Sequence, residues 1–160
     1  MMIKKINLSK KIEEKKDINM IESDILDSSK HISMINMILL DAKFDGKSTI
    51  IKNLKQKLNS YKSQDKKKNR FNEKTFISYD QLLEKLVISK LNCEYCKCKT
   101  LLMYANKRED KQWTLDRINN DLDHSNENTI ISCLKCNLER RCKNDKKFKF
   151  TKQMRLIKKN

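Results

Sequence analysis

The stretch that decides the fold runs from Trp113 to Arg141 and reads WTLDRINNDLDHSNENTIISCLKCNLERR. The segments QWTLDRI and NTIIS are rich in β-branched and aromatic residues and predict two strands. The polar residues between them predict a loop, and LKCNLERR predicts a helix that continues into a basic segment. A further strand is predicted for TLLMYA, residues 100–105. This order of elements indicates a small α+β unit.

Two Cys-x-x-Cys pairs flank the strands: Cys93 with Cys96, and Cys133 with Cys136, with 36 residues between the pairs. Two such pairs can place four thiolates at the corners of a tetrahedron, which is the closed donor set of a structural zinc site. The alternative is four buried thiols without a metal. Because a chain with little apolar content gains stability from a metal staple, we predict structural zinc.

The remaining cysteines are interpreted from the expected compartment. No apolar run reaches membrane-spanning length, and the N-terminal segment lacks the apolar region of a signal peptide. We therefore expect no membrane association and a cytoplasmic or nuclear, reducing location, where disulfides are rare. Cys98, which could compete with Cys96 as a ligand, and Cys142 are predicted to be ordinary free thiols.

The rest of the chain is predicted to be mostly α-helical, in keeping with one Gly and no Pro. Residues 1–28 are expected to form a polar arm, residues 29–61 a helical hairpin that could receive a protein partner, and residues 62–75 a charged linker. Ser48 is predicted to cap the second hairpin helix, whose apolar stripe is Ile50, Ile51, Leu54, Leu58 and Tyr61. His31 is predicted to have a structural role.

The C-terminal domain is predicted to span residues 76–147, followed by a basic tail at residues 148–160. Ser78 and Gln81 have the spacing of a capping box and predict a helix that leads into the first cysteine pair. From that helix onward, the order is Cys-x-x-Cys, a strand ending in Asp-Arg-Ile, an Asn that opens the second strand, and Cys-x-x-Cys-Asn.

In these residues the chain resembles the HNH endonucleases, which have the ββα-metal fold, over about residues 76–145. The pattern LDRIN…H…N…CxxCN is similar to that of a zinc-clipped subgroup found in phages and large DNA viruses. The resemblance implies that Asp116 and Asn137 hold a catalytic divalent cation, Mg²⁺ or Mn²⁺, and that Asn128 braces the loop between the strands. Mg²⁺ suits such a site because it takes few protein oxygens and leaves room for phosphate and water.

The chain departs from the family pattern at Arg117, which stands where the family places a His as general base. Arginine stays protonated and cannot accept a proton, so Arg117 is predicted to hold a phosphate. His124 titrates near neutral pH, lies in the loop between the strands, and is predicted to be the base. The alternatives are an exposed loop position for His124 and, for Asp116, an ion pair with Arg117 or Arg140.

The charge of the chain predicts a nucleic-acid partner. The formal net charge is +16, and residues 135–160 carry 11 Lys and Arg against 2 Asp and Glu. The function expected from these features is a metal-dependent DNA endonuclease, with RNA as the alternative substrate. The rival interpretations are a catalytically inactive zinc-ribbon-like nucleic-acid-binding protein and a protein-interaction module. The predicted phosphate contacts are Arg117, Arg140, Arg141, Lys143, Lys146 and Lys147.

Overall fold

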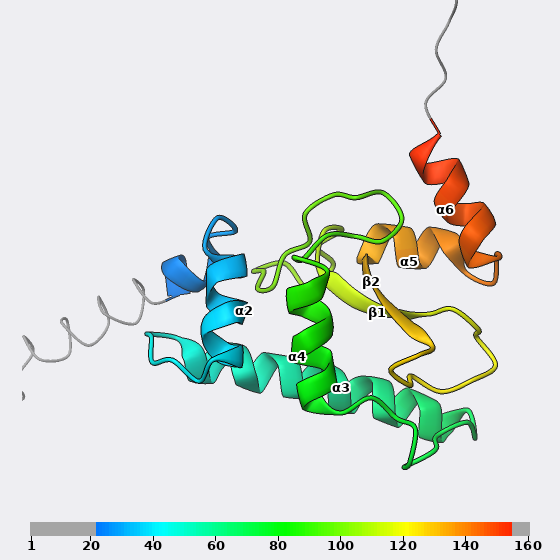
Figure 1. Ribbon diagram of the computed structural model, residues 1–160, viewed down its shortest axis with the longest axis horizontal. Coiled ribbons are helices and arrows are strands. Elements are labelled where there is room, and N and C mark those ends of the chain that lie inside the picture. Colours follow the sequence, from blue (N-terminus) through cyan, green and yellow to red (C-terminus); the bar gives the residue numbers. More distant parts are fainter. Residues whose placement is uncertain (1–21, 155–160) are drawn as a thin grey trace, which may run out of the picture.

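A computed structural model describes residues 22–154 as a mixed α+β arrangement, the predicted fold class. Figure 1 shows helices before and after a short sheet along the chain. The elements are α2 His31–Leu39, α3 Lys47–Lys67, α4 Tyr79–Ile88, β1 Trp113–Arg117, β2 Thr129–Cys133, α5 Leu134–Arg140 and α6 Asp145–Gln153. No helix among these residues is long and apolar enough to cross a lipid bilayer.

The two strands form the antiparallel sheet expected from QWTLDRI and NTIIS. Trp113 pairs with Cys133 and Arg117 pairs with Thr129. α5 begins at the residue after β2 and packs against both strands (Figure 1). The second cysteine pair is thereby placed where a strand turns into a helix, since Cys133 ends β2 and Cys136 lies in the first turn of α5.

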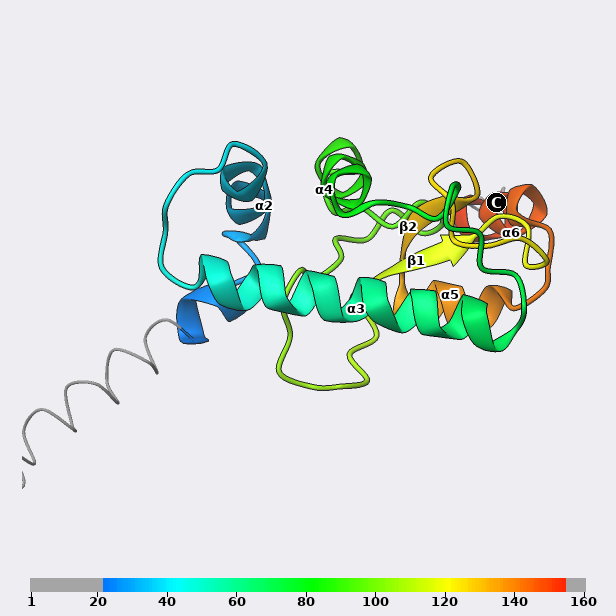
Figure 2. The ribbon, with the colours of Figure 1, turned by 90° about the horizontal axis from the view of Figure 1, so that it is seen from below.

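A single hydrophobic core joins the N-terminal helices to the sheet. Its buried members include Ile35 of α2, Leu54 of α3, Leu86 of α4, Leu115 of β1 and Ile131 of β2. Figure 2 shows α3 running beneath the strands for most of the length of the molecule. The apolar stripe of α3 therefore packs against this core, with Ile50 and Leu54 buried and Ile51, Leu58 and Tyr61 partly buried.

The prediction that residues 62–75 form a linker is wrong for residues 62–67, which belong to α3. α3 continues to Lys67, and its last turn contains the fully buried Asp65. Arg70, just beyond the helix, donates from Nη1 to the carbonyl of Asn120 at 2.7 Å. A run of lysines resembles a solvated connector, but here the lysines cover only the outer face of a helix whose inner face is packed.

The N-termini of α4 and α3 are capped in different ways. The capping box of α4 is present, with the Ser78 hydroxyl accepting from the Gln81 N–H at 3.2 Å. The prediction that Ser48 caps α3 is wrong, because the N-cap is Gly46, whose φ of 84° requires the conformational freedom of glycine. Ser48 lies inside the first turn of the helix.

The predicted strand at residues 100–105 is not formed. This segment has only an isolated parallel bridge, between Leu101 and Gln112. The backbone N–H of Leu102 is instead satisfied by Nδ1 of the buried His31, at 3.1 Å. Since that nitrogen accepts, Nε2 of His31 carries the proton and donates to the carbonyl of Ile25 at 2.9 Å. His31 thus has the predicted structural role.

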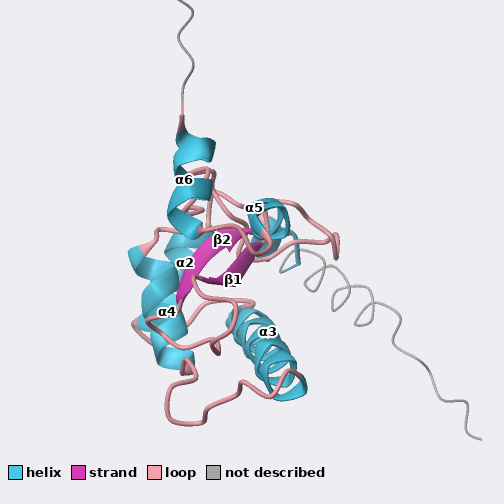
Figure 3. Cartoon of the chain, turned by 90° about the vertical axis from the view of Figure 1, so that its right-hand side faces the viewer, coloured by secondary structure: helices cyan, strands magenta, loops and turns pink. Residues whose placement is uncertain are grey.

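The C-terminal helix is interrupted. Arg141 has a φ of 53°, which ends α5 and lets α6 turn away from it. Figure 3 shows α6 above the strands and α3 below them in that view. The predicted basic tail at residues 148–160 begins inside α6, where Phe148 is buried, and residues 155–160 lie outside the described part. Most of the predicted arm, residues 1–21, also lies outside it.

Leu54→Ala tests whether α3 shares one core with the sheet. Leu54 has no exposed surface, so its truncation is expected to lower the free energy of unfolding by about 2–5 kcal/mol. Denaturation followed by fluorescence of Trp113, the single Trp, reports the sheet directly. Lys52→Ala, at an exposed position of α3, should change stability by less than about 0.5 kcal/mol. An unshifted Trp113 transition in Leu54→Ala would contradict the shared core.

Candidate metal centre and adjoining cavity

The four predicted cysteines come together in one group that could hold a metal ion. The Sγ atoms of Cys93, Cys96, Cys133 and Cys136 all lie within 4.8 Å of one another. A tetrahedral ion with Zn–S bonds of about 2.3 Å requires sulfur atoms about 3.8 Å apart. The Cys96 and Cys133 sulfur atoms are separated by 3.9 Å, so the donor set fits such an ion.

The local backbone prepares this group for thiolates. The N–H of Cys136 donates to Sγ of Cys133 at 3.4 Å, at the positive end of α5. The hydrogen bond from Cys133 and nearby backbone N–H groups lower the pKa of Cys93 to about 5, whereas burial raises the pKa of Cys136 to about 12. A bound cation favours the thiolate form of all four, because it offsets both burial and mutual repulsion.

The cysteine group also forms a small core of its own. The ring of Tyr95 meets that of Phe148 edge-on at 4.9 Å, which fixes α6 against the first cysteine turn. Cys98 lies beside the group without joining it, and Cys142 is exposed. Within residues 22–154, no second group of three or more His, Cys, Asp or Glu side chains has metal-binding geometry.

Asp116 is held by a buried arginine. Its Oδ2 accepts from Nε of Arg140 at 2.6 Å and from the hydroxyl of Tyr95 at 2.6 Å, and its Oδ1 accepts from Nη2 of Arg140 at 3.0 Å. Burial opposes the charge of Arg140, but Asp116 outweighs it and raises the pKa of Arg140. This is the ion pair considered as the alternative for Asp116, and it neutralises the carboxylate that the resemblance assigns to a cation.

Arg140 is consequently not a phosphate contact. It is 1 % exposed, and its guanidinium also donates to the carbonyls of Arg117 and Lys143 and to Oδ1 of Asn120. Five hydrogen bonds from this one guanidinium thus join β1, the loop between the strands and the turn after α5. Removing it would leave Asp116 as an unpaired buried charge.

Two asparagines support the loop and the helix. Asn128 accepts from the N–H of Asn119 at 2.8 Å and donates to the carbonyls of Asn119 and Asp123 at 2.9 and 2.8 Å. It spans the loop between the strands, as the resemblance implies. Asn137 donates from Nδ2 to Oγ1 of Thr114 at 3.1 Å, which ties α5 to β1.

A cavity of about 240 Å³ collects the four side chains predicted to be catalytic. It lies where α3, β1, the loop between the strands and the end of α5 meet. His124 is 3 % exposed and belongs to the wall of this cavity, in contrast to the alternative of an exposed loop residue. The lining residues are Tyr61, Gln64, Leu115, Asp116, Arg117, Asn120, His124, Asn137, Arg141 and Cys142.

Arg117 and Arg141, the two arginines that line the cavity, differ in their hydrogen bonds and in their exposure. Arg117 donates from Nη1 to the carbonyls of Asn120 and Leu122 at 3.0 and 3.2 Å, so one edge of its guanidinium is used by the loop. Burial lowers the pKa of Arg117, although arginine remains charged. Arg141 is exposed and lines both this cavity and the groove beside it.

Sequence reasoning missed one residue at this site, Asp65. Its Oδ2 accepts from both the backbone N–H and Nδ1 of His124, each at 2.8 Å. The signal lay in the helical stripe, because Leu58, Tyr61 and Asp65 follow one another at spacings of three and four residues on the same face of α3. The surrounding lysines concealed it.

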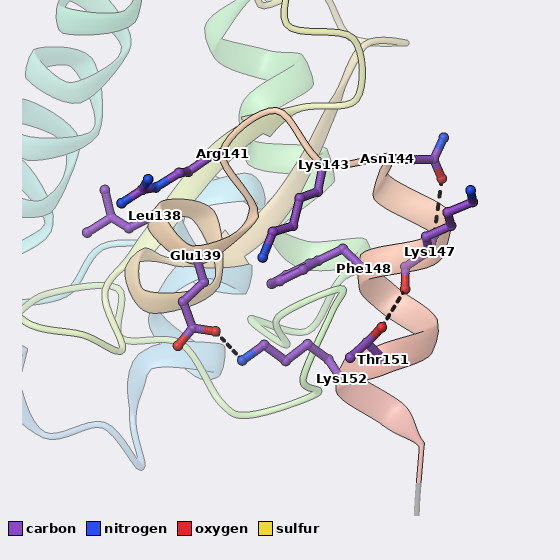
Figure 4. Close-up of a pocket in the computed structure, with 9 residues that line it drawn as sticks. All are labelled: Leu138, Glu139, Arg141, Lys143, Asn144, Lys147, Phe148, Thr151 and Lys152. Carbon is purple, nitrogen blue, oxygen red and sulfur yellow. Dashed lines mark hydrogen bonds and ion pairs between the residues drawn. The ribbon is translucent and has the colours of Figure 1, made fainter.

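An open groove of about 1050 Å³ lies between α5 and α6 and adjoins the cavity (Figure 4). Leu138 and Phe148 are among its lining residues, and Lys152 pairs with Glu139 across it. Three of the predicted phosphate contacts, Arg141, Lys143 and Lys147, are exposed and line this groove, and Lys146 is exposed on α6 outside its lining.

Comparison of the chain with protein-family models, with curated proteins and with solved structures finds no match.

Cys133→Ser tests the metal centre. The variant should lose the ion and the cooperative unfolding transition, because Cys133 is both a donor and the N-cap of α5. Elemental analysis of protein purified without chelator should find one ion per wild-type chain. Cys142→Ser, at an exposed position outside the group, should retain it. Metal-free wild-type protein with an unchanged transition would contradict a structural ion.

Proposed function

We propose that this chain is an endonuclease similar to the HNH enzymes, with zinc in the four-cysteine group as a structural staple. The observation that carries the proposal is the cavity shared by Asp116, Arg117, His124 and Asn137, next to a basic groove. A base, cations and polar groups around a small cavity suit hydrolysis of a phosphodiester bond. DNA is the proposed substrate.

Zinc suits the four-cysteine group because four thiolates complete its tetrahedral coordination and leave no open position. The group connects the turn after α4 to the junction of β2 and α5. Its role is therefore to hold the strands and α5 together at the cavity, and the ion itself takes no part in the reaction.

The chemistry proposed for the cavity uses the residues of the chain. His124 takes a proton from a water molecule as the water oxygen forms a bond to phosphorus. The bond from phosphorus to the leaving oxygen breaks, and that oxygen takes a proton from solvent. Arg141 and the free edge of Arg117 face the negative charge that develops on the phosphate.

The Mg²⁺ or Mn²⁺ implied by the resemblance does not fit the residues in this arrangement. Both oxygens of Asp116 accept hydrogen bonds from Arg140 or Tyr95, and the guanidinium of Arg140 already neutralises the carboxylate. Mg²⁺ is usually bound through one or two carboxylates whose charge is available to it. No step is therefore assigned to a divalent cation.

A second candidate is nucleic-acid binding without cleavage. It is favoured by the Asp116–Arg140 pair, in which a buried guanidinium lies against the carboxylate that the resemblance assigns to the metal. The basic groove and the structural ion have the same roles in this candidate, and only the chemistry of the cavity differs.

His124→Ala separates the two candidates. If His124 is the base, nicking of supercoiled plasmid should slow by roughly 10²–10⁴-fold. The assay is run with Mg²⁺, with Mn²⁺ and with chelator, and Asp121→Ala, exposed in the same loop, should match wild type. Equal nicking by His124→Ala would remove it from the mechanism. Wild-type protein that binds plasmid without nicking it under any of the three conditions would refute the endonuclease.

Lys146→Gln with Lys147→Gln tests the basic face. Both side chains are exposed on α6, so the double variant should fold normally and bind duplex DNA more weakly. Each lost phosphate contact should reduce the slope of log affinity against log salt by about 0.9. Fluorescence anisotropy over a salt series gives this slope. Lys43→Gln with Lys52→Gln, also exposed but near the α2–α3 turn, is the matched control. Equal slopes in the two double variants would exclude α6 from the interface.

A further inference from the structure

Asp65 has an unusual environment for a carboxylate near the end of a lysine-rich helix. It has no exposed surface. Its Oδ1 accepts from Nε of Arg70 at 3.2 Å and lies 3.8 Å from Nη1 of Arg117. Although burial raises the pKa of Asp65, the hydrogen bonds from His124 and Arg70 hold it below its ordinary value. Asp65 is therefore a carboxylate and can only accept hydrogen bonds.

The charge of Asp65 decides the tautomer of His124. Because Nδ1 lies 2.8 Å from Oδ2 of Asp65, the neutral ring carries its proton on Nδ1. Nε2 then has a free lone pair. Among residues 22–154, this nitrogen has no hydrogen-bond partner, and it is not fully buried. The ring lines the cavity while Asp65 lies behind it.

Tyr61 fixes the ring from the same helix. Its ring centroid lies 4.8 Å from that of His124 at an angle of 37°. The Tyr61 hydroxyl accepts from the N–H of Leu115 at 3.1 Å, and burial raises its pKa well above the ordinary value. Tyr61 thus remains protonated and positions the ring by packing.

We propose that Asp65 is a positioning residue for His124: it holds the imidazole as the Nδ1–H tautomer, so that Nε2 accepts the proton of the attacking water. This rests on the proposed endonuclease function. In a serine hydrolase triad a buried carboxylate acts on a histidine in the same way. Here the carboxylate comes from α3, so the N-terminal helices are part of the catalytic unit, with a role beyond packing.

The pH dependence follows from the groups that face the imidazole. Burial lowers the pKa of His124 below its ordinary value of 6.5, Asp65 raises it, and the arginines lower it. The cleavage rate should therefore be maximal above pH 6.5 and should fall at lower pH, because a protonated Nε2 cannot accept the proton of the water. The titratable or charged neighbours are Tyr61, Asp65, Arg70, Asp116, Arg117, Arg141 and Cys142.

Asp65→Asn tests the proposal by two measurements. The first is imidazole ¹⁵N spectroscopy, which is simple because the chain has only two histidines. In wild type, His124 should be the Nδ1–H tautomer and His31 the Nε2–H tautomer, since Nδ1 of His31 accepts a backbone hydrogen bond. Asp65→Asn should shift His124 towards the other tautomer and leave His31 unchanged.

The second measurement is the pH–rate profile of plasmid nicking. Asp65→Asn should lower the maximal rate by roughly 10–10⁴-fold, the range seen when a carboxylate that orients a histidine is removed. Its acid limb should move to lower pH, because the carboxylate that raises the pKa of His124 is gone. Asp65→Glu should restore part of the rate. Asp80→Asn, at an exposed position of α4, is the control and should change neither measurement.

The outcomes separate this proposal from the proposed function. An Nε2–H tautomer in wild type overturns the positioning role, and this result does not depend on the folding of any variant. An unchanged tautomer in folded Asp65→Asn overturns it as well. Wild-type cleavage with an unchanged rate and profile in Asp65→Asn overturns the inference and leaves the endonuclease intact. A wild-type Nδ1–H tautomer without cleavage refutes the endonuclease and, with it, the catalytic use of this pair.

Discussion

The four sulfur atoms of Cys93, Cys96, Cys133 and Cys136 are the constraint on which the arrangement of the site depends. They connect the turn after α4 to the junction between β2 and α5, two segments far apart in sequence. Because α5 starts at this junction, the position of the sulfur atoms fixes the helix against β1 and β2. One wall of the cavity and the basic groove beside it both follow from that placement.

Two buried carboxylates hold the residues around the cavity in place. Asp116, on β1, is neutralised by Arg140 and thereby joins the sheet, the loop and the turn after α5. Asp65, on α3, is bound to His124 and Arg70 on the other side. The first pair stabilises the structure around the cavity, and the second orients the one imidazole in its wall. The proposed chemistry of the site therefore depends on α3, which lies outside the segment that carries the sequence motifs.

Local patterns in the sequence were sufficient for the strands, the capping box of α4, the cysteine group and the structural role of His31. They failed where long-range contacts decide. Residues 100–105 have a strand-like composition, but their backbone is satisfied by His31, which is 71 positions away from Leu102 in the sequence. Arg140 is indistinguishable in sequence from its exposed basic neighbours, and its burial depends on the matching position of Asp116. Asp65 was hidden because a lysine-rich stretch gives no sign that its inner face is packed.

X-ray absorption at the edge of the bound metal is the most direct test of whether a sulfur-bound ion builds the site. We expect zinc with four sulfur neighbours at about 2.3 Å and no nitrogen or oxygen in the first coordination shell. A shell with fewer than four sulfur atoms, or one containing nitrogen or oxygen ligands, would contradict it.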